Sequence, residues 1–551
     1  MIEKEQVERI IEQTEGAKVV KTFAPDAIGG LRGKIAIDAG ESKEVEWDVH
    51  VAQSYPFKVM GVEPITFTNL DLIDYPHIME AGGLCMHPAI YEDAEAQFFH
   101  DLEQLKEWVE KYYVRGEKDE HYEHLIVNSE AIDKALYNVW FAETEDEIKE
   151  GDYGQVNYAM MGAGVHLENK TTTLLLTSFE SKQGFRGRTT NCKISKAYKD
   201  GGKYSGVYCI LKEAPSIHGK FIIKRYKELE RLMTQSQLDF LHTFEEHYKG
   251  DKGFFPLMLG YRIPEGGTHW QAAIMMMDDM PIEGFKIGVG VQRQWHTRFL
   301  DEKIYWAHTE DVSYRYFFGR GAMPLELAEK KMLVMGVGAI GSMVAVTLVR
   351  CGAKYIVLND IDKKEPGNVC RSEYQFIAGC GDKAFELMSV LWNISPHVEC
   401  GIESPVLDLG IKGLIGTEDG RKAIAEKLNE YDIIFDCTTD NQLMQVLDGV
   451  GYRGRLVNLS ITNHAQDLVC VFAPSVSRAV SFIYRLLGRD AERDLYNPTG
   501  CWSPTFMASY NDVACKVQFT MKHVIKMLSG EEPTGNFYIT EDDVNLKIVR
   551  V

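Results

Sequence analysis

The glycine-rich stretch MGVGAIGSM, residues 335–343, is the feature that most constrains the fold of this 551-residue chain. The apolar run KMLVM leads into it and the apolar run AVTLVRCG follows it, so the glycines fall between a predicted strand and a predicted helix. Gly336, Gly338 and Gly341 would let backbone N–H groups approach a phosphate at the start of that helix. The pattern predicts a nucleotide site, but it does not choose between a dinucleotide and ATP.

The segment 326–551 alternates strand and helix patterns. The predicted strands are KMLVMGVG, YIVLND, YDIIFDCT and RLVNLSI, and the predicted helices include KAFELMSVLW and the long NDVACKVQFTMKHVIKML. Strands separated by helices are typical of a doubly wound, mostly parallel sheet with ligands at the carboxyl ends of its strands. We therefore predict an α/β domain of Rossmann-like type here, with the glycine turn at its ligand edge.

The first segment, residues 1–148, predicts an α+β domain. It opens with the charged helix pattern MIEKEQVERIIEQTEG and continues through the strand patterns KIAIDAG, VEWDVHVA and EPITFTN. Apolar residues at helical spacing then predict a helix over 91–115. The acidic stretch AETEDEIKEGDYG, residues 142–154, is expected to be a linker.

The middle segment, residues 155–325, predicts a mixed, strand-rich domain with a helix near 226–247. Its strand patterns include TTTLLLTSF, KFIIKRY and WQAAIMMMDD. The glycine run IGVGVQ lacks a third glycine at phosphate-loop spacing and lies between strand residues, so it predicts a hairpin. No motif in this segment indicates chemistry.

Charge and cysteine content narrow the class of protein. A formal charge of −21 would repel nucleic acid and anionic membrane, so we expect neither as a partner. The chain has no run of about 18 apolar residues, and its N-terminus lacks the pattern of a signal peptide, so a cytoplasmic location is expected. Eleven cysteines without a C-x-x-C pair fit reduced thiols better than a disulfide framework or a zinc ribbon.

Polar residues downstream of the glycines favour ATP over a dinucleotide. The stretches NDIDKKEPGNVCRSEYQF, GDKAFELM and FDCTTDNQ follow predicted strands or begin predicted helices at the same sheet edge. Asp360 alone would suit the ribose of NAD, which keeps an NAD-dependent oxidoreductase open as an alternative. Arg371 and Lys383 have no evident use in hydride transfer, whereas a triphosphate under attack needs fixed cations and a metal.

In order and spacing, residues 331–465 resemble the ThiF/MoeB and ubiquitin-activating-enzyme adenylation family. The resemblance implies ATP and Mg²⁺ as cofactors, and a carboxylate that is activated as an acyl-adenylate. The implied roles are Asp360 or Asp362 for the ribose, Asn368, Arg371 and Lys383 for the phosphates, and Asp440 for Mg²⁺.

Members of this family that go beyond adenylation pass the acyl group to a cysteine. The stretch YNPTGCWSPTF places Cys501 in a loop rich in proline and glycine before the last predicted helix, which favours access to the thiol. Cys370, Cys437 and Cys515 lie in regular contexts, where cysteines are normally buried. Cys501 is therefore the predicted nucleophile, and the sequence does not identify the group that activates it.

A second thiol lies in the first segment. The stretch YPHIMEAGGLCMHP resembles the active-site stretch of ubiquitin-conjugating enzymes, with seven residues from Ile78 to Cys85 as in that family. His77 stands where the family has an asparagine that stabilises the oxyanion, so His77 either takes that role or the role is absent. The alternative is a degenerate fold with a buried Cys85, and His87 is a possible activator.

Together these resemblances predict a fusion of an activating and a conjugating enzyme, similar to the fusion proteins of bacterial CBASS anti-phage operons. They imply a homodimer that activates the C-terminus of a cGAS-like nucleotidyltransferase and passes it through Cys501 and Cys85 to a lysine amine. A bacterial ubiquitin-like protein is the alternative acyl donor. A binding scaffold without turnover and an NAD-dependent oxidoreductase are the alternatives from other classes.

Overall fold

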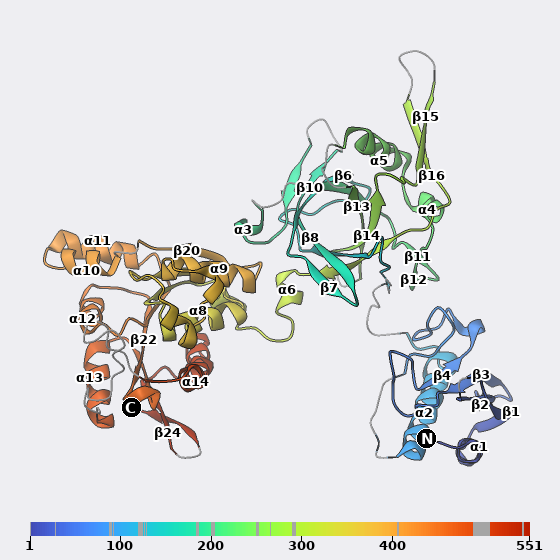
Figure 1. Ribbon diagram of the computed structural model, residues 1–551, viewed down its shortest axis with the longest axis horizontal. Helices are drawn as coiled ribbons and strands as arrows, with labels where there is room; N and C mark the ends of the chain where they lie inside the picture. Colours follow the sequence, from blue (N-terminus) through green and yellow to red (C-terminus); the bar gives the residue numbers. More distant parts are fainter. Residues whose placement is uncertain are drawn as a thin grey trace.

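The computed structural model in Figure 1 shows three sheet-containing parts along the chain. The residues that it describes are 2–27, 29–86, 91, 93–118, 125, 127, 129–182, 187–199, 204–248, 253–264, 266–288, 294–404, 407–488, 507–542 and 545–551.

The N-terminal part packs two helices on an antiparallel sheet of order β1-β2-β3-β4. Its strands are β1 (Ala17–Pro25), β2 (Leu31–Asp38), β3 (Glu44–Val51) and β4 (Ile65–Thr68). Its helical segments are α1 (Lys4–Gln13), η1 (Leu70–Leu72), α2 (Ala94–Trp108) and the π turn η2 (Val109–Val114). The helix predicted over 91–115 is therefore present, with its last turn in π geometry.

Aromatic contacts join α2 to this sheet. The rings of Trp47 on β3 and Trp108 on α2 meet edge to face at 5.3 Å, and Trp47 is fully buried. The hydroxyl of Tyr55 also donates to the buried carboxylate of Asp101 on α2 at 2.7 Å. These contacts fix α2, and with it the π turn, against the loops that follow β3 and β4.

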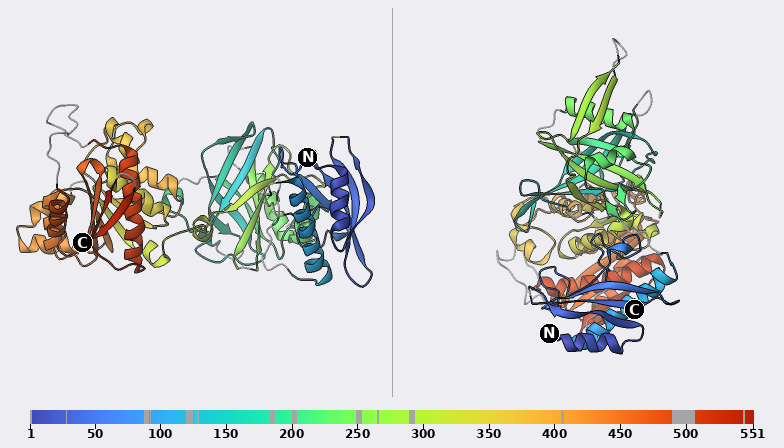
Figure 2. Two further views of the ribbon diagram at one scale, coloured as in Figure 1. Left: turned by 90° about the horizontal axis from the view of Figure 1, so that it is seen from below. Right: turned by 90° about the vertical axis from the view of Figure 1, so that its right-hand side faces the viewer.

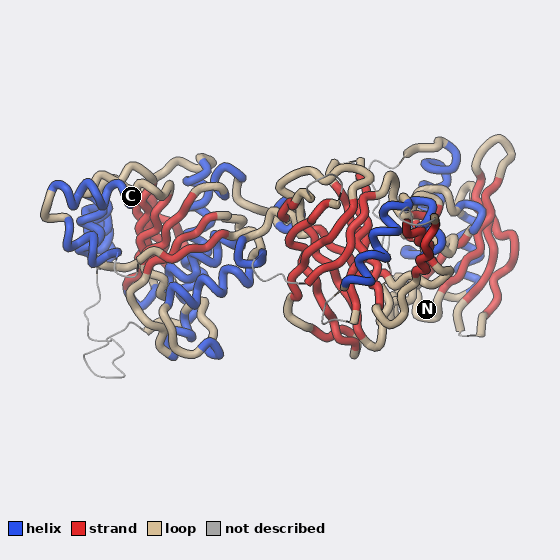
Figure 3. Tube along the Cα trace, turned by 90° about the horizontal axis from the view of Figure 1, so that it is seen from above, coloured by secondary structure: helices blue, strands red, loops and turns tan. Residues whose placement is uncertain are grey.

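The middle part is a closed sheet of order β5-β17-β14-β13-β10-β6-β8, in which β5 also pairs in parallel with β8. The strands are β5 (Ala135–Phe141), β6 (Tyr153–Met160), β7 (Gly164–His166), β8 (Asn169–Ser181), β9 (Thr189–Asn191), β10 (Tyr204–Ile210), β13 (Phe254–Arg262), β14 (Thr268–Met276) and β17 (Trp306–Asp311). The pairing of β5 with β8 makes the sheet a barrel, which Figure 3 shows as the strand-rich centre of the molecule.

Short elements surround this barrel. They are α3 (Lys196–Lys199), the hairpin β11 (Ser216–Ile217) and β12 (Phe221–Ile222), α4 (Tyr226–Leu229), η3 (Glu230–Leu232), α5 (Gln235–His247), the hairpin β15 (Ile282–Ile287) and β16 (Gln294–Phe299), α6 (Tyr314–Phe317) and α7 (Leu325–Ala328). The strands on either side of IGVGVQ, β15 and β16, pair antiparallel as the predicted hairpin requires, while residues 289–293 lie outside the described residues.

The domain boundary expected at residue 148 does not agree with the pairing of the strands. Ala135–Phe141 lies within the segment assigned to the first domain, yet it hydrogen-bonds in parallel to both β8 and β17 of the barrel. The acidic stretch 142–154 consequently connects two barrel strands, β5 and β6, instead of two domains. The sequence predicted no strand over 135–141 and carries no information about strand partners, which is why these residues were assigned to the first domain.

The C-terminal part contains an eight-stranded sheet of order β20-β19-β18-β21-β22-β23-β24-β25. The strands are β18 (Lys331–Met335), β19 (Tyr355–Asn359), β20 (Glu399–Ile402), β21 (Ile433–Asp436), β22 (Arg455–Thr462), β23 (Asp467–Phe472), β24 (Phe537–Glu541) and β25 (Leu546–Arg550). The pairs from β20 to β22 are parallel, and the three remaining pairs are antiparallel. The predicted doubly wound domain is thus present with an antiparallel extension.

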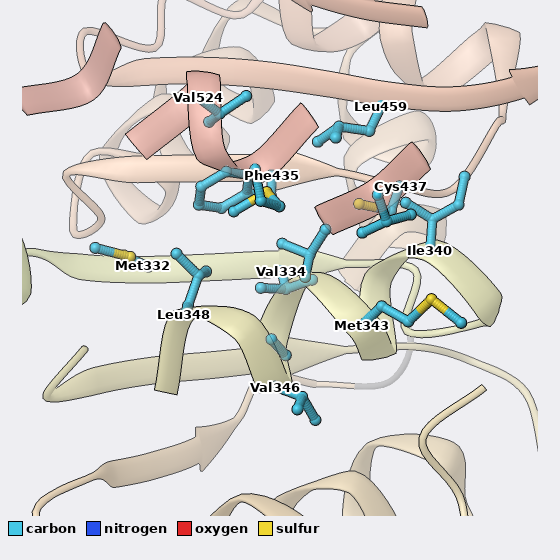
Figure 4. Packing of buried hydrophobic residues seen from close by; sticks show 14 of the residues in the cluster. Met332, Val334, Ile340, Met343, Val346, Leu348, Phe435, Cys437, Leu459 and Val524 are labelled. Carbon is cyan, nitrogen blue, oxygen red and sulfur yellow. The ribbon is translucent and has the colours of Figure 1, made fainter. Parts of the chain in front are cut away.

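Helices cover both faces of this sheet. They are α8 (Ala339–Arg350), η5 (Pro366–Arg371), η6 (Phe376–Ala378), α9 (Lys383–Ile394), α10 (Leu407–Leu414), α11 (Glu418–Leu428), α12 (Asn441–Gly449), η7 (Asn463–Ala465), α13 (Val476–Leu487) and α14 (Tyr510–Ser529). Alternate residues of β18 face opposite cores: Met332 and Val334 pack with α8, α9 and α14, whereas Leu333 and Met335 pack with α11, α12 and α13. Figure 4 shows Val334 and Phe435 between Leu348 on one side and Val524 on the other in the first of these cores.

The strand order places a topological switch at β18. The chain passes from β18 to β19 on one side, and β21 pairs with its other side. In open α/β sheets a crevice forms at such a point, beyond the carboxyl ends of the strands. The loops after β18, β19 and β21 therefore meet where a ligand is expected.

The barrel lies between the other two parts, as the left view in Figure 2 shows. Ser195 N–H donates to the carbonyl of Pro396 at 2.7 Å, and His397 Nε2 lies 2.7 Å from the carbonyl oxygen of Val312, which joins the barrel side to the C-terminal part. Among the described residues, no helix is both long and apolar enough to cross a membrane.

Core packing gives a first prediction. Leu348 on α8 is fully buried, so Leu348→Ala should lower the free energy of unfolding by about 2–5 kcal/mol. Leu414→Ala, at a half-exposed position in the same part, is the control and should change it by less than about 1 kcal/mol. Urea denaturation of the full chain measures both, and equal effects would contradict this account of the core.

Candidate functional site

The glycine turn after β18 requires glycine at two positions. Gly336 has a φ of +76°, and a Cβ there would lie 2.8 Å from the backbone N and Cα of Thr438. A Cβ on Gly341 would lie 2.0 Å from the carbonyl oxygen of Gly336. The turn is therefore pressed against both its own helix and the loop after β21.

Gly338 faces open space instead. It is the N-cap of α8, it makes no side-chain capping bond, and a Cβ there would meet nothing within 4 Å. The first N–H groups of a helix have no partner within it and carry partial positive charge. This end of α8 therefore offers donors to an anion, with room for the anion to approach.

Asp360 organises the turn through its carboxylate. Oδ2 accepts from Val337 N–H at 2.8 Å, and Oδ1 accepts from Asp362 N–H at 2.8 Å. Burial raises the pKa of Asp360, while these two N–H groups and the Lys383 ammonium act in the opposite direction without cancelling it. Because a carboxylate has about four acceptor positions, Asp360 can hold the turn and still accept from a ribose hydroxyl.

Lys383 and Asp362 form the adjacent ion pair. Lys383 is the first residue of α9, its side chain is 12% exposed, and its Nζ lies 2.8 Å from Oδ2 of Asp362. The carboxylate thus holds the ammonium beside the carboxyl end of β19. Lys383 is thereby linked directly to the loop that carries Asp360.

Asn368 and Arg371 lie in the short helix η5. The side chain of Asn368 accepts from Glu365 N–H at 2.9 Å, so in this structure it caps η5. The segment after Arg371 is fixed to the glycine turn, because Glu373 N–H donates to Ser342 Oγ at 3.2 Å and the hydroxyl of Tyr374 donates to the carbonyl of Val337. The structure therefore brings η5 to the same edge by way of Tyr374.

Asp440 ends the loop after β21 and begins α12. Its Oδ1 accepts from the N–H groups of Gln442 and Leu443 at 2.8 and 3.1 Å, and its Oδ2 pairs with the ammonium of Lys412. Partial burial raises the pKa of Asp440, but Lys412 and the two N–H groups outweigh burial, so the pKa lies below its ordinary value. Asp440 is accordingly ionised at neutral pH.

The chemistry of Asp440 fits a magnesium ligand. Mg²⁺ is commonly bound by one or two carboxylates together with substrate phosphates and water, so it needs no cage of protein ligands. The described residues contain no cluster of three or more His, Cys, Asp or Glu that could hold a metal without a substrate. Asp440 would therefore share the ion with the phosphates, and Mg²⁺ bound there would offset their negative charge.

Three further residues at this edge were not predicted. Lys412 comes from α10, and nothing in its local sequence indicates that it pairs with Asp440. Tyr374 lies in the stretch RSEYQF, but only the fold shows its contact with the turn. Asp436, buried at the end of β21, accepts from Thr438 Oγ1 at 2.6 Å and from Asn458 Nδ2 at 2.9 Å, and burial raises its pKa.

The thiol of Cys85 lies in a separate loop after β4 and is exposed. The backbone N–H of Cys85 donates to the carbonyl of His77 at 2.8 Å, and Ile78 pairs with Leu84 in an isolated antiparallel bridge. Gly82 makes the turn between them with a φ of +78°. The expected alternative of a buried Cys85 is therefore wrong, because the loop presents the thiol outward.

His77 has an uncommon backbone conformation, with a φ of +59°. Its Nε2 lies 3.0 Å from the hydroxyl of Tyr112, a residue of the π turn η2. Single π turns are frequent at functional sites. The π turn thus places Tyr112 to orient the imidazole, and the oxyanion role of His77 stays a prediction.

The remaining cysteine predictions have different outcomes. Cys501 and His87 lie outside the described residues. Cys437 is buried as expected, and burial raises its pKa well above the ordinary value, while Cys515 is half-buried. Cys370 is exposed, contrary to expectation, because η5 is a short surface helix that leaves this side chain outside the core.

The glycine turn yields a paired prediction. Gly341→Ala should disrupt the turn and lower the thermal stability of the C-terminal part, because its methyl group would overlap the Gly336 carbonyl. Gly338→Ala should leave stability nearly unchanged but weaken nucleotide binding at least about tenfold, because its methyl group would occupy the space before α8. Calorimetry and ATP titration measure both effects, and full ATP affinity in Gly338→Ala would contradict the placement of the anion.

Comparison with known proteins gives a family match and several relatives of part of the chain. Residues 316–449 match the ThiF family. The ATP-dependent ubiquitin transferase-like protein Cap2 of Enterobacter hormaechei subsp. hoffmannii (strain UCI 50) is 23% identical over 425 residues, covering 71% of this chain. The ubiquitin-like modifier-activating enzyme 5 of Caenorhabditis elegans is 35% identical over 78 residues, covering 14% of this chain.

Coverage of these proteins is partial. This chain spans 67% of the length of Cap2 and 19% of the length of the C. elegans enzyme. A crystal structure of E. coli MccB with ATP aligns with 41% of this chain and 64% of its own chain, at 15% identity and a TM-score of 0.30. The chain carries a ThiF-family domain and is an enzyme of the activating and transferase type.

Proposed function

We propose that this enzyme uses ATP to activate the C-terminal carboxylate of a protein and passes the acyl group through two cysteines to an amine. The ThiF-family domain and the two relatives, a ubiquitin transferase-like protein and a ubiquitin-like modifier-activating enzyme, support adenylation in a ubiquitin-like conjugation. One observation carries the proposal: the ammonium groups of Lys383 and Lys412 and the N-terminus of α8 gather at one topological switch.

These positive groups suit a triphosphate whose innermost phosphorus is attacked. A carboxylate oxygen of the donor forms a bond to the α-phosphorus, the bond to the bridging oxygen breaks, and pyrophosphate leaves. Lys383, Arg371 and the N-terminus of α8 would offset charge on the phosphates, and Asn368 would contact them as well. Asp360 or Asp362 would hold the ribose, and Asp440 would bind Mg²⁺.

Acyl transfer would follow at the two thiols. The thiolate of Cys501 would attack the acyl carbon and release AMP, which leaves a thioester on the enzyme. The thiolate of Cys85 would then displace Cys501, and an amine would displace Cys85 with formation of an amide. The exposure of Cys85 supports its place as the last carrier, because an acceptor protein must reach it.

The donor and the assembly are part of the same proposal. Similarity to the CBASS fusion proteins supports a cGAS-like nucleotidyltransferase as the donor, a lysine amine on a target as the acceptor, and a homodimer as the working unit in anti-phage defence. A bacterial ubiquitin-like protein is the alternative donor. Loading assays with the C-terminal segments of the two donor classes distinguish between them.

Adenylation is tested by pyrophosphate exchange into ATP. Lys383→Met should lower the exchange rate about 100-fold, because a fixed cation is lost from the phosphates. Asp440→Ala should abolish exchange, and Asp440→Asn, which can still cap α12, should abolish it too if the charge matters. Lys422→Met, at an exposed position on α11, is the control and should retain full exchange.

Retention of exchange in both Asp440 variants would argue against the metal role. If the wild-type chain shows no pyrophosphate exchange with either donor segment, the adenylation proposal is wrong. A binding scaffold and an NAD-dependent oxidoreductase then remain as the functions to test. Titration with NAD then separates these two outcomes.

The thiol assignments are tested by thioester trapping. Cys501→Ala should retain pyrophosphate exchange and lose every reductant-sensitive acyl band, because transfer stops at the adenylate. Cys85→Ala should accumulate the thioester on Cys501. Cys370→Ala is the matched control at another exposed cysteine, and both thioester bands should remain in this variant. Loss of the first thioester in Cys370→Ala would show that the nucleophile is Cys370 and not Cys501.

A further inference from the structure

The hairpin β11–β12 of the middle part touches the loop that carries Cys85. Lys220 lies at the tip of this hairpin, between Ser216–Ile217 and Phe221–Ile222. Its Nζ donates to the carbonyl of Tyr75 at 2.6 Å and to the carbonyl of Ile78 at 3.1 Å. Hydrogen bonds from an ammonium are stronger than those between neutral groups, so one side chain fixes two points of the loop.

The two carbonyls between these points also have donors. The indole N–H of Trp108 donates to the carbonyl of Pro76 at 2.9 Å, and Cys85 N–H donates to the carbonyl of His77 at 2.8 Å. Four successive carbonyls are therefore held, and the one that positions Cys85 lies between the two that Lys220 holds. A shift of either outer carbonyl would move the carbonyl of His77 and with it the backbone of Cys85.

Neighbouring ion pairs are weaker anchors. His218 Nδ1 lies 2.7 Å from Oδ1 of Asp74, and Lys224 Nζ lies 2.5 Å from Oε1 of Glu80, but all four side chains are well exposed. Exposed ion pairs of this kind contribute little to stability, because water and salt screen their charges. Lys220 is half-buried, which makes it the main polar link between the hairpin and the loop.

Apolar packing at this contact is incomplete. A cavity of about 420 Å³ lies between Met79 and Glu80 of the loop and Phe221, Ile222 and Trp306 of the middle part. A gap of this size means that shape alone does not set how the loop meets the barrel side. The two hydrogen bonds of the Lys220 ammonium are directional contacts between this loop and the hairpin.

We propose that the middle part completes the Cys85 site and that Lys220 is a positioning residue for this thiol. The catalytic consequence of this role rests on the proposed function. When an amine attacks the thioester, the bond from nitrogen to the acyl carbon forms as the bond to sulfur breaks, and both need a fixed sulfur position. Lys220 supplies that fixation from the middle part, in which no catalytic side chain is proposed.

Hydrogen exchange in the full chain tests the positioning role without any substrate. Lys220→Met keeps the aliphatic stem but removes the donors, and it should speed amide exchange in a peptide spanning 75–86 at least about tenfold. Lys220→Arg restores donors and should return exchange towards the wild-type rate. Lys212→Met, at an exposed position in the same part, is the control and should exchange as the wild type does.

Transfer kinetics then separate positioning from general stability. Lys220→Met should lower kcat for discharge of the Cys85 thioester to an amine about tenfold, with an unchanged KM for the amine, an unchanged Tm and unchanged pyrophosphate exchange. Wild-type amide exchange in Lys220→Met would overturn the proposal, and so would undiminished discharge. A wild-type chain that forms no Cys85 thioester would defeat the proposed function, while the amide exchange would still decide whether Lys220 holds the loop.

Discussion

A carboxylate held between two backbone N–H groups fixes the nucleotide edge of this enzyme. Asp360 accepts from Val337 and Asp362, so it joins the end of β19 to the turn after β18. The left-handed Gly336 and the tight approach of Gly341 leave the backbone one path, and the carboxylate stabilises that path. The open N-terminus of α8 follows from this arrangement, and Lys383 lies near the same carboxylate through its ion pair with Asp362.

Local sequence patterns predicted the elements that form this edge. The apolar runs before Gly336 and Asp360 are short strands buried on both faces, which is what a parallel sheet requires, and the structure confirms β18, β19, β21 and β22. The antiparallel strands β23 to β25 and the closure of the barrel were not predicted. Their pairing joins segments that are distant in sequence, and periodicity carries no information about which strands pair.

Prediction of the polar residues from the sequence has the same limit. The order of the motif residues predicted that Asp362, Lys383 and Asp440 lie at one edge of the C-terminal sheet, and all three lie there in the fold. Lys412 escaped notice because it comes from a helix that lies outside the motif. The exposure of Cys370 was not predicted, because it lies on a short surface helix that buries only some of its side chains. The pairing of Lys412 with Asp440 is a contact between elements that are distant in sequence, which sequence spacing does not encode.

The strand β5 has a consequence for how the enzyme can move. It is the first barrel strand after the N-terminal part, and it is bonded on both sides, to β8 and to β17. Any rotation of the N-terminal part relative to the barrel would have to occur before Ala135, because rotation beyond that residue would break the hydrogen bonds that close the barrel. Such a rotation would also have to break the hydrogen bonds from Lys220 to the carbonyls of Tyr75 and Ile78, which join the loop of Cys85 to the middle part.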